Sequence, residues 1–215
     1  MTSMTLYNAD LSPFTTRVRI QIRAKGLEND IAMAPRPEGD AYKLINPLGK
    51  VPALDTGASF VLPESEVIAE YIEDSFPEPS LRGHTALGKA KVRLFSRLVD
   101  LYLMPGFALL FAQMNPATRD AAKAAEGLAK VDEALTHIES HLEGPLFATQ
   151  GRLTLADCAL VPALFFTTNV LPMSGGAPFG GKAKIKTYYE TITRDDAQCA
   201  RAVQEMATAL ASFRR

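Results

Sequence analysis

The sequence predicts an α/β domain followed by an all-helical domain, and three observations indicate it. The first third of the chain alternates short apolar runs with amphipathic stretches, as strands and helices do in turn. A proline-rich break at Phe76–Ser80 follows, and it is the best linker in the chain. Beyond it, apolar residues recur only at helical spacing. We therefore predict an α/β domain over residues 1–79 and an all-α domain over residues 80–215.

The composition is that of a soluble globular protein that can bury a core. Of the 215 residues, 47% are hydrophobic and 22% are charged, and the formal net charge is −1. This charge gives no electrostatic reason to expect a nucleic acid or a membrane as partner. We expect no apolar run near the length of a bilayer span and no signal peptide. Cys158 and Cys199 lack metal-ligand spacing, so we expect buried thiols, no metal and a reducing, cytoplasmic location.

A strand and a helix open the chain. Thr5–Tyr7 predicts the strand. Ser12 at the N-cap and Pro13 at the first helical position are strong signals for a helix start. Gly26 ends this helix.

Two further helices and three strands complete the first domain. Ile31–Ala34 predicts the second strand, and Ala41–Ile45 predicts a short helix. A short strand that Pro52 opens and a second one from Phe60 are predicted, joined by a tight turn around Asp55-Thr56-Gly57, and an amphipathic helix follows from Glu64. The order β-α-β-α-β-β-α is the thioredoxin-like pattern.

The second domain is predicted from helical stripes. One stripe marks a long helix, which Pro105-Gly106 should kink or interrupt. Its members are Leu87, Leu94, Leu98 and Leu101. Another stripe repeats by three and four, and consists of Leu128, Val131, Leu135, Ile138 and Leu142.

Two features near the middle of the first domain are hard to explain by packing. Pro52 opens a strand, where it removes a backbone donor, and this makes sense if the Val51–Pro52 bond is cis and offers the Val51 backbone to a ligand. Glu64-Ser65 stands at a helix start, where N–H groups and the helix dipole attract a carboxylate. The alternatives are an edge-strand or loop proline and a plain helix cap.

These residues resemble two motifs of the glutathione transferase family. In that family, the residue before a cis-proline pairs its backbone with the cysteinyl part of glutathione, and an acidic-Ser pair at the next helix start holds the γ-glutamyl end. Val51-Pro52 and Glu64-Ser65 stand in those two places. The resemblance implies glutathione as cosubstrate and the family's fold, a thioredoxin-like N-terminal domain with an all-α C-terminal domain.

A second, distant location supports the resemblance. Thr154 with Asp157 three residues on is close to a capping box. The same start is characteristic of a buried helix in the C-terminal domain of the family, where it serves folding. The resemblance, which covers essentially the whole chain, also implies a homodimer, with the N-terminal domain of one subunit against the C-terminal domain of the other.

Ser12 is the predicted catalytic residue. In the family, an activating Ser or a reactive Cys lies at the start of the first helix. Ser12-Pro13-Phe14 resembles the Cys-Pro-Phe of omega-like members, with Ser replacing Cys. The run SPFTTRVRI from Ser12 also resembles the Ser-x-x-Ser-x-Arg-Val-Arg-Ile of the zeta class, whose members isomerise maleylacetoacetate or maleylpyruvate. The zeta Ser-Ser-Cys is replaced here by Ser12-Pro13-Phe14.

A hydroxyl at a helix start can supply the stabilisation that a thiolate needs. Lowering a thiol pKa from about 8.5 to about 6.5 takes roughly 2.7 kcal/mol. A hydrogen bond to a charged group contributes about 1.5–3 kcal/mol, and a helix N-terminus about 0.3–1 kcal/mol. The alternatives are that Ser12 only caps the helix, or that Tyr7 is the donor, although Tyr7 lies in a strand pattern typical of a core residue.

Four other side chains are candidates for contact with substrates. Phe14 and Lys50 are predicted to contact glutathione, Lys50 through a carboxylate, although a loop lysine is more often solvated. The second substrate is expected to be partly apolar and to lie between the first helix and the long helix. Tyr102 and Phe107 are the candidates there, although a Phe stripe at helical spacing is usually core.

The sequence thus predicts a transferase that uses Ser12 to activate the glutathione thiolate for attack on a small, partly apolar electrophile. A glutathione-dependent isomerase or ether-cleaving enzyme is the first alternative, and a non-catalytic binding protein of this fold is the second. Retention of Ser12, Val51-Pro52 and Glu64-Ser65 favours the enzyme. A thiol–disulfide oxidoreductase is disfavoured, because Ser12 cannot form a mixed disulfide.

Overall fold

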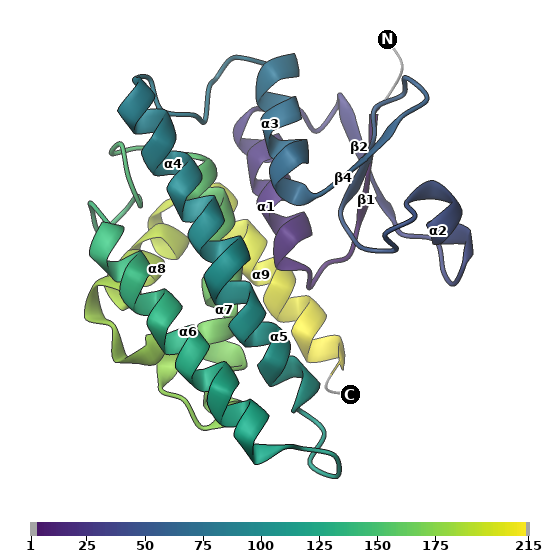
Figure 1. Ribbon diagram of the computed structural model, residues 1–215. Helices are drawn as coiled ribbons and strands as arrows, with labels where there is room; N and C mark the ends of the chain where they lie inside the picture. The colour runs from purple at the N-terminus through teal and green to yellow at the C-terminus, as the bar shows by residue number, and fades with distance from the viewer. Residues whose placement is uncertain (1–3, 214–215) are drawn as a thin grey trace. The chain divides into compact units, whose positions relative to one another are not determined.

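Two units make up the part of the chain that the computed structural model describes, residues 4–213 (Figure 1). The first unit comprises residues 4–81 and 198–213, and the second comprises residues 82–197. The predicted linker at Phe76–Ser80 lies just before the change from one unit to the other. The last helix, α9 (Ala197–Phe213), belongs mainly to the first unit, whereas the sequence pattern placed it with the helical domain.

The first unit is built on a four-stranded sheet. Its strands are β1 (Met4–Asn8), β2 (Ile31–Pro35), β3 (Ala53–Asp55) and β4 (Val61–Pro63), and its helices besides α9 are α1 (Pro13–Ala24), α2 (Ala41–Ile45) and α3 (Ser65–Ser75). The spatial order is β2-β1-β3-β4, in which β1 runs parallel to β2 and antiparallel to β3, and β3 runs antiparallel to β4. Figure 1 shows α1 and α3 on one side of the sheet and α2 on the other. This confirms the predicted thioredoxin-like order.

Helix α1 begins and ends at the predicted residues. The Ser12 Oγ accepts a hydrogen bond from the Thr15 backbone N–H at 3.3 Å, and Pro13 is the first helical residue. At the other end, Gly26 has a φ of 70°, which glycine adopts without steric cost. These local signals fix where Ser12 lies, at the N-terminal end of α1.

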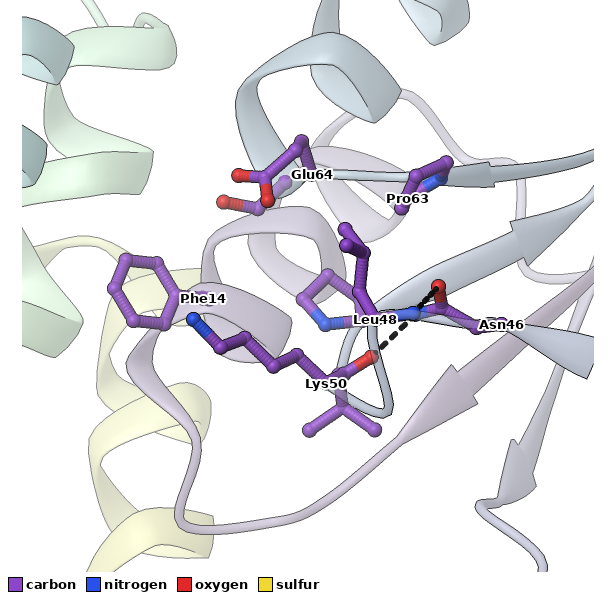
Figure 2. A pocket seen from close by; sticks show the side chains of 9 residues that line it. Phe14, Asn46, Leu48, Lys50, Pro63 and Glu64 are labelled. Carbon is purple, nitrogen blue, oxygen red and sulfur yellow. Dashed lines mark hydrogen bonds between the residues drawn. The ribbon is translucent and has the colours of Figure 1, made fainter. Parts of the chain in front are cut away.

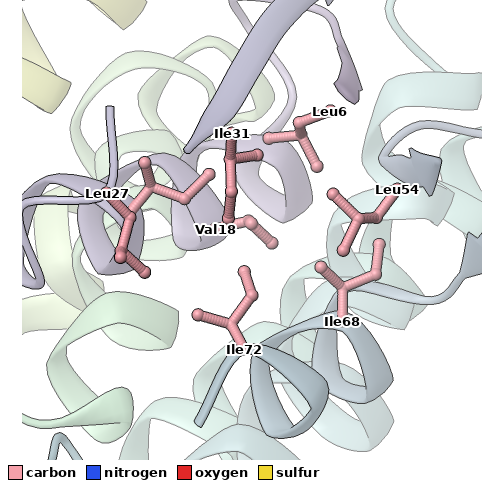
Figure 3. Close-up of a cluster of buried hydrophobic side chains, with 8 residues drawn as sticks. Leu6, Val18, Leu27, Ile31, Leu54, Ile68 and Ile72 are labelled. Carbon is pink, nitrogen blue, oxygen red and sulfur yellow. The ribbon is translucent and has the colours of Figure 1, made fainter. Parts of the chain in front are cut away.

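The core of the first unit lies between the sheet and the helices α1 and α3 (Figure 3). It consists of Leu6, Val18, Ile22, Leu27, Ile31, Leu54, Ile68 and Ile72. Burying one such side chain contributes about 1.5–3 kcal/mol. This core therefore fixes α1 and α3, whose N-terminal ends carry the predicted site residues.

A buried ion pair connects α1 and α3 to residues 79–81, where the first segment of the first unit ends. The Lys25 Nζ lies 3.1 Å from Glu73 Oε1, and the two side chains are 0% and 1% exposed. Lys25 also donates to the Pro79 carbonyl at 2.7 Å, and the Leu81 N–H donates to Glu73 Oε2 at 3.0 Å. A buried pair is tolerated when extra hydrogen bonds satisfy both groups, as they do here.

The second unit consists of helices, as predicted. They are α4 (Ala86–Leu98), a π-helical segment (Val99–Leu103), α5 (Met104–Ala112), α6 (Ala121–His141), α7 (Leu155–Asn169) and α8 (Ala183–Asp195), with short 3₁₀ turns at Pro172–Ser174 and Pro178–Gly181. The interruption expected at Pro105 takes the form of the π-helical segment directly before it, where the Met104 N–H donates to the Val99 carbonyl. The chain thus accommodates proline without breaking the helix.

The continuous helical stretch Ala86–Ala112 corrects one expectation. It is long and apolar enough, by length and composition, to cross a membrane, whereas the sequence had suggested no such run. Half of its apolar window is buried inside the structure, and a core helix of a soluble protein passes the same test. This is weak evidence for a membrane span.

Candidate functional site

A cavity of about 110 Å³ lies in the first unit at the N-terminal end of α3 (Figure 2). Nine residues line it: Phe14, Asn46, Leu48, Lys50, Val51, Pro52, Pro63, Glu64 and Ser65. The structure therefore brings together all six residues that the sequence predicted to bind glutathione, from α1, the loop before β3, and the start of α3. Their role toward glutathione stays a prediction.

The loop before β3 is held by two donors that converge on one carbonyl. The Lys50 carbonyl accepts from Asn46 Nδ2 at 2.7 Å and from the Tyr42 hydroxyl at 2.9 Å. The Val51–Pro52 peptide bond is cis, as expected for a proline that opens this strand and offers the Val51 backbone to a ligand. Asn46 lines the cavity and was missed as a site residue. The signal was the run Asn46-Pro47-x-Gly-Lys, in which the buried Asn46 shapes the loop.

Helix α3 begins without a side-chain cap among the described residues. Its N-cap residue, Glu64, is exposed and has a φ of 68°, a backbone region that non-glycine residues rarely adopt. Ser65 is 5% exposed, and no hydrogen bond of its hydroxyl is described within residues 4–213. The first-turn N–H groups and the positive end of the helix dipole therefore remain available to an anion.

The charged groups of the cavity differ in sign. Figure 2 shows the Lys50 amine extending toward Phe14, and the Glu64 carboxylate directed into the same region. Both side chains are exposed. Lys50 and the start of α3 attract a carboxylate, whereas Glu64 attracts an ammonium group. The cavity thus suits the end of a molecule that carries both charges.

Ser12 lies outside the set of lining residues, although Phe14 two residues later belongs to it. Ser12 is half-buried, and its Oγ accepts the Thr15 N–H. Among the described contacts, none uses the hydroxyl hydrogen, so this hydrogen is available for donation. The rival donor, Tyr7, lies in β1, with its ring 5.9 Å from that of Tyr42.

The candidates for the second substrate lie in the second unit and differ in exposure. Phe107 is fully buried against Phe111 and Phe166, which is the core placement usual for a Phe stripe, and it offers no surface to a substrate. Tyr102 is 50% exposed and lines a small cavity with Pro105. Within the described residues, Cys158 and Cys199 are buried, as predicted, and form no disulfide. Within residues 4–213, no group of three His, Cys, Asp or Glu side chains is placed to hold a metal.

Comparisons with known proteins agree with this architecture. The family model "Glutathione S-transferase, N-terminal domain" matches residues 6–80, and "Glutathione S-transferase, C-terminal domain" matches residues 120–190. A maleylpyruvate isomerase from a Ralstonia species is 38% identical over 106 residues, which are 47% of this chain and 50% of that one. The chain therefore spans about half the length of this relative.

Two solved structures are similar over nearly the whole chain. A zeta-class bacterial maleylpyruvate isomerase, in its holo form, has a TM-score of 0.75 at 27% identity, covering 92% of this chain and 95% of that one. A glutathione S-transferase from Methylobacillus flagellatus, with glutathione bound, has a TM-score of 0.80 at 22% identity, covering 93% and 98%. At 22% identity, the likeness to the Methylobacillus flagellatus structure shows the fold alone. With two domain models of one family matching in the right order, the chain belongs to the glutathione S-transferase family.

Proposed function

We propose that the protein is a glutathione transferase in which Ser12 stabilises the glutathione thiolate for attack on a small, partly apolar electrophile. The cavity at the start of α3 is the observation that supports this most. Lys50, the Ser65 hydroxyl and the helix start favour a carboxylate, and Glu64 favours an ammonium. The γ-glutamyl end of glutathione carries both groups on one carbon.

In this proposal, the rest of glutathione lies along the loop before β3. The backbone of Val51 pairs with the cysteinyl part, which directs the thiol toward the start of α1. Ser12 accepts the Thr15 N–H and donates its own hydrogen to the sulfur. The thiolate forms a carbon–sulfur bond with the electrophile, and the electrophile's leaving group departs with the electron pair.

The direct test is to measure the pKa of the bound glutathione thiol, by monitoring the ultraviolet absorbance of the thiolate as a function of pH. Ser12→Ala should raise this pKa and slow conjugation at neutral pH, with the loss shrinking at higher pH as the thiolate forms unaided. Ser12→Cys should form an adduct with oxidised glutathione, visible by mass spectrometry, because a thiol at a helix N-terminus has a lowered pKa. Full activity of Ser12→Ala, together with no glutathione adduct on Ser12→Cys, would contradict the role of Ser12 and make Tyr7 the next candidate for the thiolate donor.

A glutathione-dependent isomerase is the second candidate, favoured by the likeness to the two maleylpyruvate isomerases. Such an enzyme adds the thiolate to a cis-enedione and releases it again after rotation about the former double bond, so glutathione is not consumed. Ether cleavage by thiolate attack is a third reaction that the same site could perform. A panel of electrophiles, with glutathione consumption followed in parallel, separates these reactions.

We also propose a homodimer. Three leucines on the long helical stretch of the second unit are exposed: Leu87 by 66%, Leu94 by 36% and Leu101 by 51%. Apolar side chains that recur along one helix favour burial against a partner. Sedimentation should give twice the chain mass of 23.3 kDa, and Leu94→Glu should shift it toward the monomer. Met173→Glu, at another exposed apolar position of this unit, is the control.

A cytoplasmic location and a role in detoxification complete the proposal, since a supply of reduced glutathione is needed. Cell fractionation tests the first. The second predicts that cells lacking the protein are more sensitive to the electrophiles that it conjugates, and equal sensitivity would argue against that role.

A further inference from the structure

The loop between β1 and α1 ends in Ser12, so whatever fixes this loop also fixes the hydroxyl. Within the described residues, one backbone hydrogen bond closes the turn, from the Ser12 N–H to the Ala9 carbonyl at 3.0 Å, and another, from the Thr16 N–H to the Ser12 carbonyl at 3.0 Å, joins Ser12 to the first turn of α1. A short, partly exposed loop with so few backbone hydrogen bonds does not by itself hold a side chain accurately. The remaining contacts that hold the loop come from side chains.

Arg19, at the end of the second turn of α1, supplies these contacts. Its Nη1 donates to Asp10 Oδ1 at 3.0 Å, and its Nη2 donates to the Asp10 carbonyl at 3.1 Å. Nη1 also lies 3.5 Å from Asn8 Oδ1, at the end of β1. The planar guanidinium thus holds the side chain and the backbone of the same loop residue, which a lysine could not do.

A second connection reaches Ser12 itself through Thr16. Arg19 Nη2 donates to Thr16 Oγ1 at 2.9 Å, and the Thr16 hydroxyl donates to the Ser12 carbonyl at 2.9 Å. Thr16 is fully buried. The two routes therefore fix the loop at Asp10 and at Ser12 from one side chain.

The Arg19 side chain is buried and lies near two carboxylates. Its side chain is 3% exposed, and Glu205 Oε2 of α9 lies 3.7 Å from its Nη2. Burial lowers the pKa of Arg19 from its ordinary value, while the Glu205 and Asp10 carboxylates oppose this shift. Changing the geometry of a buried, paired charge costs more free energy than changing that of an exposed charge.

We propose that Arg19 is the positioning residue of the loop that presents Ser12, acting directly on Asp10 and through Thr16 on the Ser12 backbone. This inference rests on the proposed role of Ser12. Arg19 touches neither glutathione nor the electrophile in this scheme. It sets the direction of a hydroxyl that does.

Arg23 provides a matched control, because it lies one turn further along α1 with a side chain that is 4% exposed. Its Nη2 donates to Glu205 Oε1 at 2.8 Å, and it has no described contact with the loop. Arg19→Lys should raise the pKa of the bound glutathione thiol by about 0.5–1 unit, which lowers the thiolate fraction by about three- to tenfold at a pH below that pKa. Arg23→Lys should leave that pKa unchanged.

Thr16 and Thr15 give a second pair, which stays informative if Arg19→Lys fails to fold. Both are fully buried, but Thr16 Oγ1 makes two hydrogen bonds, whereas Thr15 Oγ1 has no partner within residues 4–213. Valine matches the shape of threonine, so Thr16→Val should raise the bound-thiol pKa and Thr15→Val should not.

The outcomes separate the inference from the proposed function. Raised thiol pKa values in Arg19→Lys and Thr16→Val, with wild-type values in both controls, support the positioning role. If Ser12→Ala raises the pKa while Arg19→Lys and Thr16→Val only lower thermal stability, as Arg23→Lys also would, Arg19 is merely structural and the inference fails. If Ser12→Ala itself leaves the pKa unchanged, the proposed role of Ser12 fails, and the inference fails with it.

Discussion

Two helices of this protein begin with the same pair of chemical groups, a carboxylate and a hydroxyl, and use them differently. At the start of α7, the Asp157 carboxylate accepts from the Thr154 N–H at 2.8 Å, the Ala148 N–H at 2.7 Å and the Tyr188 hydroxyl at 3.0 Å. At the start of α3, Glu64 is exposed, and the Ser65 hydroxyl has no partner among the described residues. One helix start is closed by its own chain, and the other remains open.

Residue type alone therefore does not separate a folding motif from a candidate binding site, because the two groups are satisfied within the chain at α7 and not at α3. Asp157 is fully buried, and burial raises the pKa of its carboxyl to about 6 although its hydrogen bonds oppose the shift. A closed helix start of this kind should control stability, and an open one should control ligand affinity. Four predictions test that division, from the largest expected effect to the smallest.

Asp157→Ala should lower the free energy of unfolding by about 3–5 kcal/mol, because it leaves several buried donors without an acceptor, each costing about 1–3 kcal/mol. Glu64→Ala, the matched change at the open helix start, should alter it by less than about 0.5 kcal/mol. Urea denaturation followed by circular dichroism measures both. Equal losses in the two variants would contradict the division.

The stability advantage of the wild type over Asp157→Asn should depend on pH. Because the pKa of Asp157 is about 6 when folded and near the ordinary value of 3.8 when unfolded, its protonated form favours the folded state. The advantage is therefore fully present below pH 3.8 and declines as pH rises through 6, by up to about 3 kcal/mol. Denaturation series at pH 4 and pH 7 for both proteins measure it, and a constant difference would show that the carboxyl does not titrate in this range.

Glu64→Gly should stabilise the first unit by about 0.5–1 kcal/mol, since glycine adopts the positive φ of this position without steric cost. It should also weaken glutathione binding, because the carboxylate is lost. Ser59→Gly is the control, as Ser59 has a φ of 61° but does not line the cavity. A gain in stability for Glu64→Gly with unchanged affinity in calorimetry would remove the Glu64 carboxylate from the site.

Ser65→Ala should change stability least, by less than about 0.5 kcal/mol. It should instead weaken glutathione binding by roughly 1–3 kcal/mol, because the glutathione carboxylate loses a charge-assisted hydrogen-bond donor. Ser96→Ala, which removes another buried hydroxyl in the second unit, should affect neither glutathione affinity nor the site. Unchanged calorimetric affinity for Ser65→Ala would exclude Ser65 from binding.

Local signals explain why much of this could be predicted from the sequence. Ser12 with Pro13 fixes the start of α1, and Gly26 fixes its end, because capping and turn preferences act over a few residues. The cavity residues around Pro52 and Glu64 were found because Pro52 removes a donor at a strand start and Glu64-Ser65 stands at a helix start, in the spacing of two motifs of the family. Such signals need no knowledge of tertiary contacts.

Contacts between distant segments explain what could not be predicted. Leucines spaced along α4 predicted one shared face, yet Leu98 is buried while Leu94 is partly exposed, since the neighbouring helices decide which side is covered. The interaction of Arg19 with Asp10 depends on how the loop folds back over α1. The placement of α9 in the first unit joins segments far apart in the sequence, as the pairing of Glu205 with Arg23 does.

That last contact has a consequence for the order in which the protein is made. Glu205 of α9 pairs with Arg23 and lies near Arg19, yet the whole second unit separates these residues along the chain. During synthesis on the ribosome, both arginines therefore emerge long before their carboxylate exists. The first unit starts first and finishes last, so the surroundings of the loop that carries Ser12 reach their final form only after the second unit has been translated.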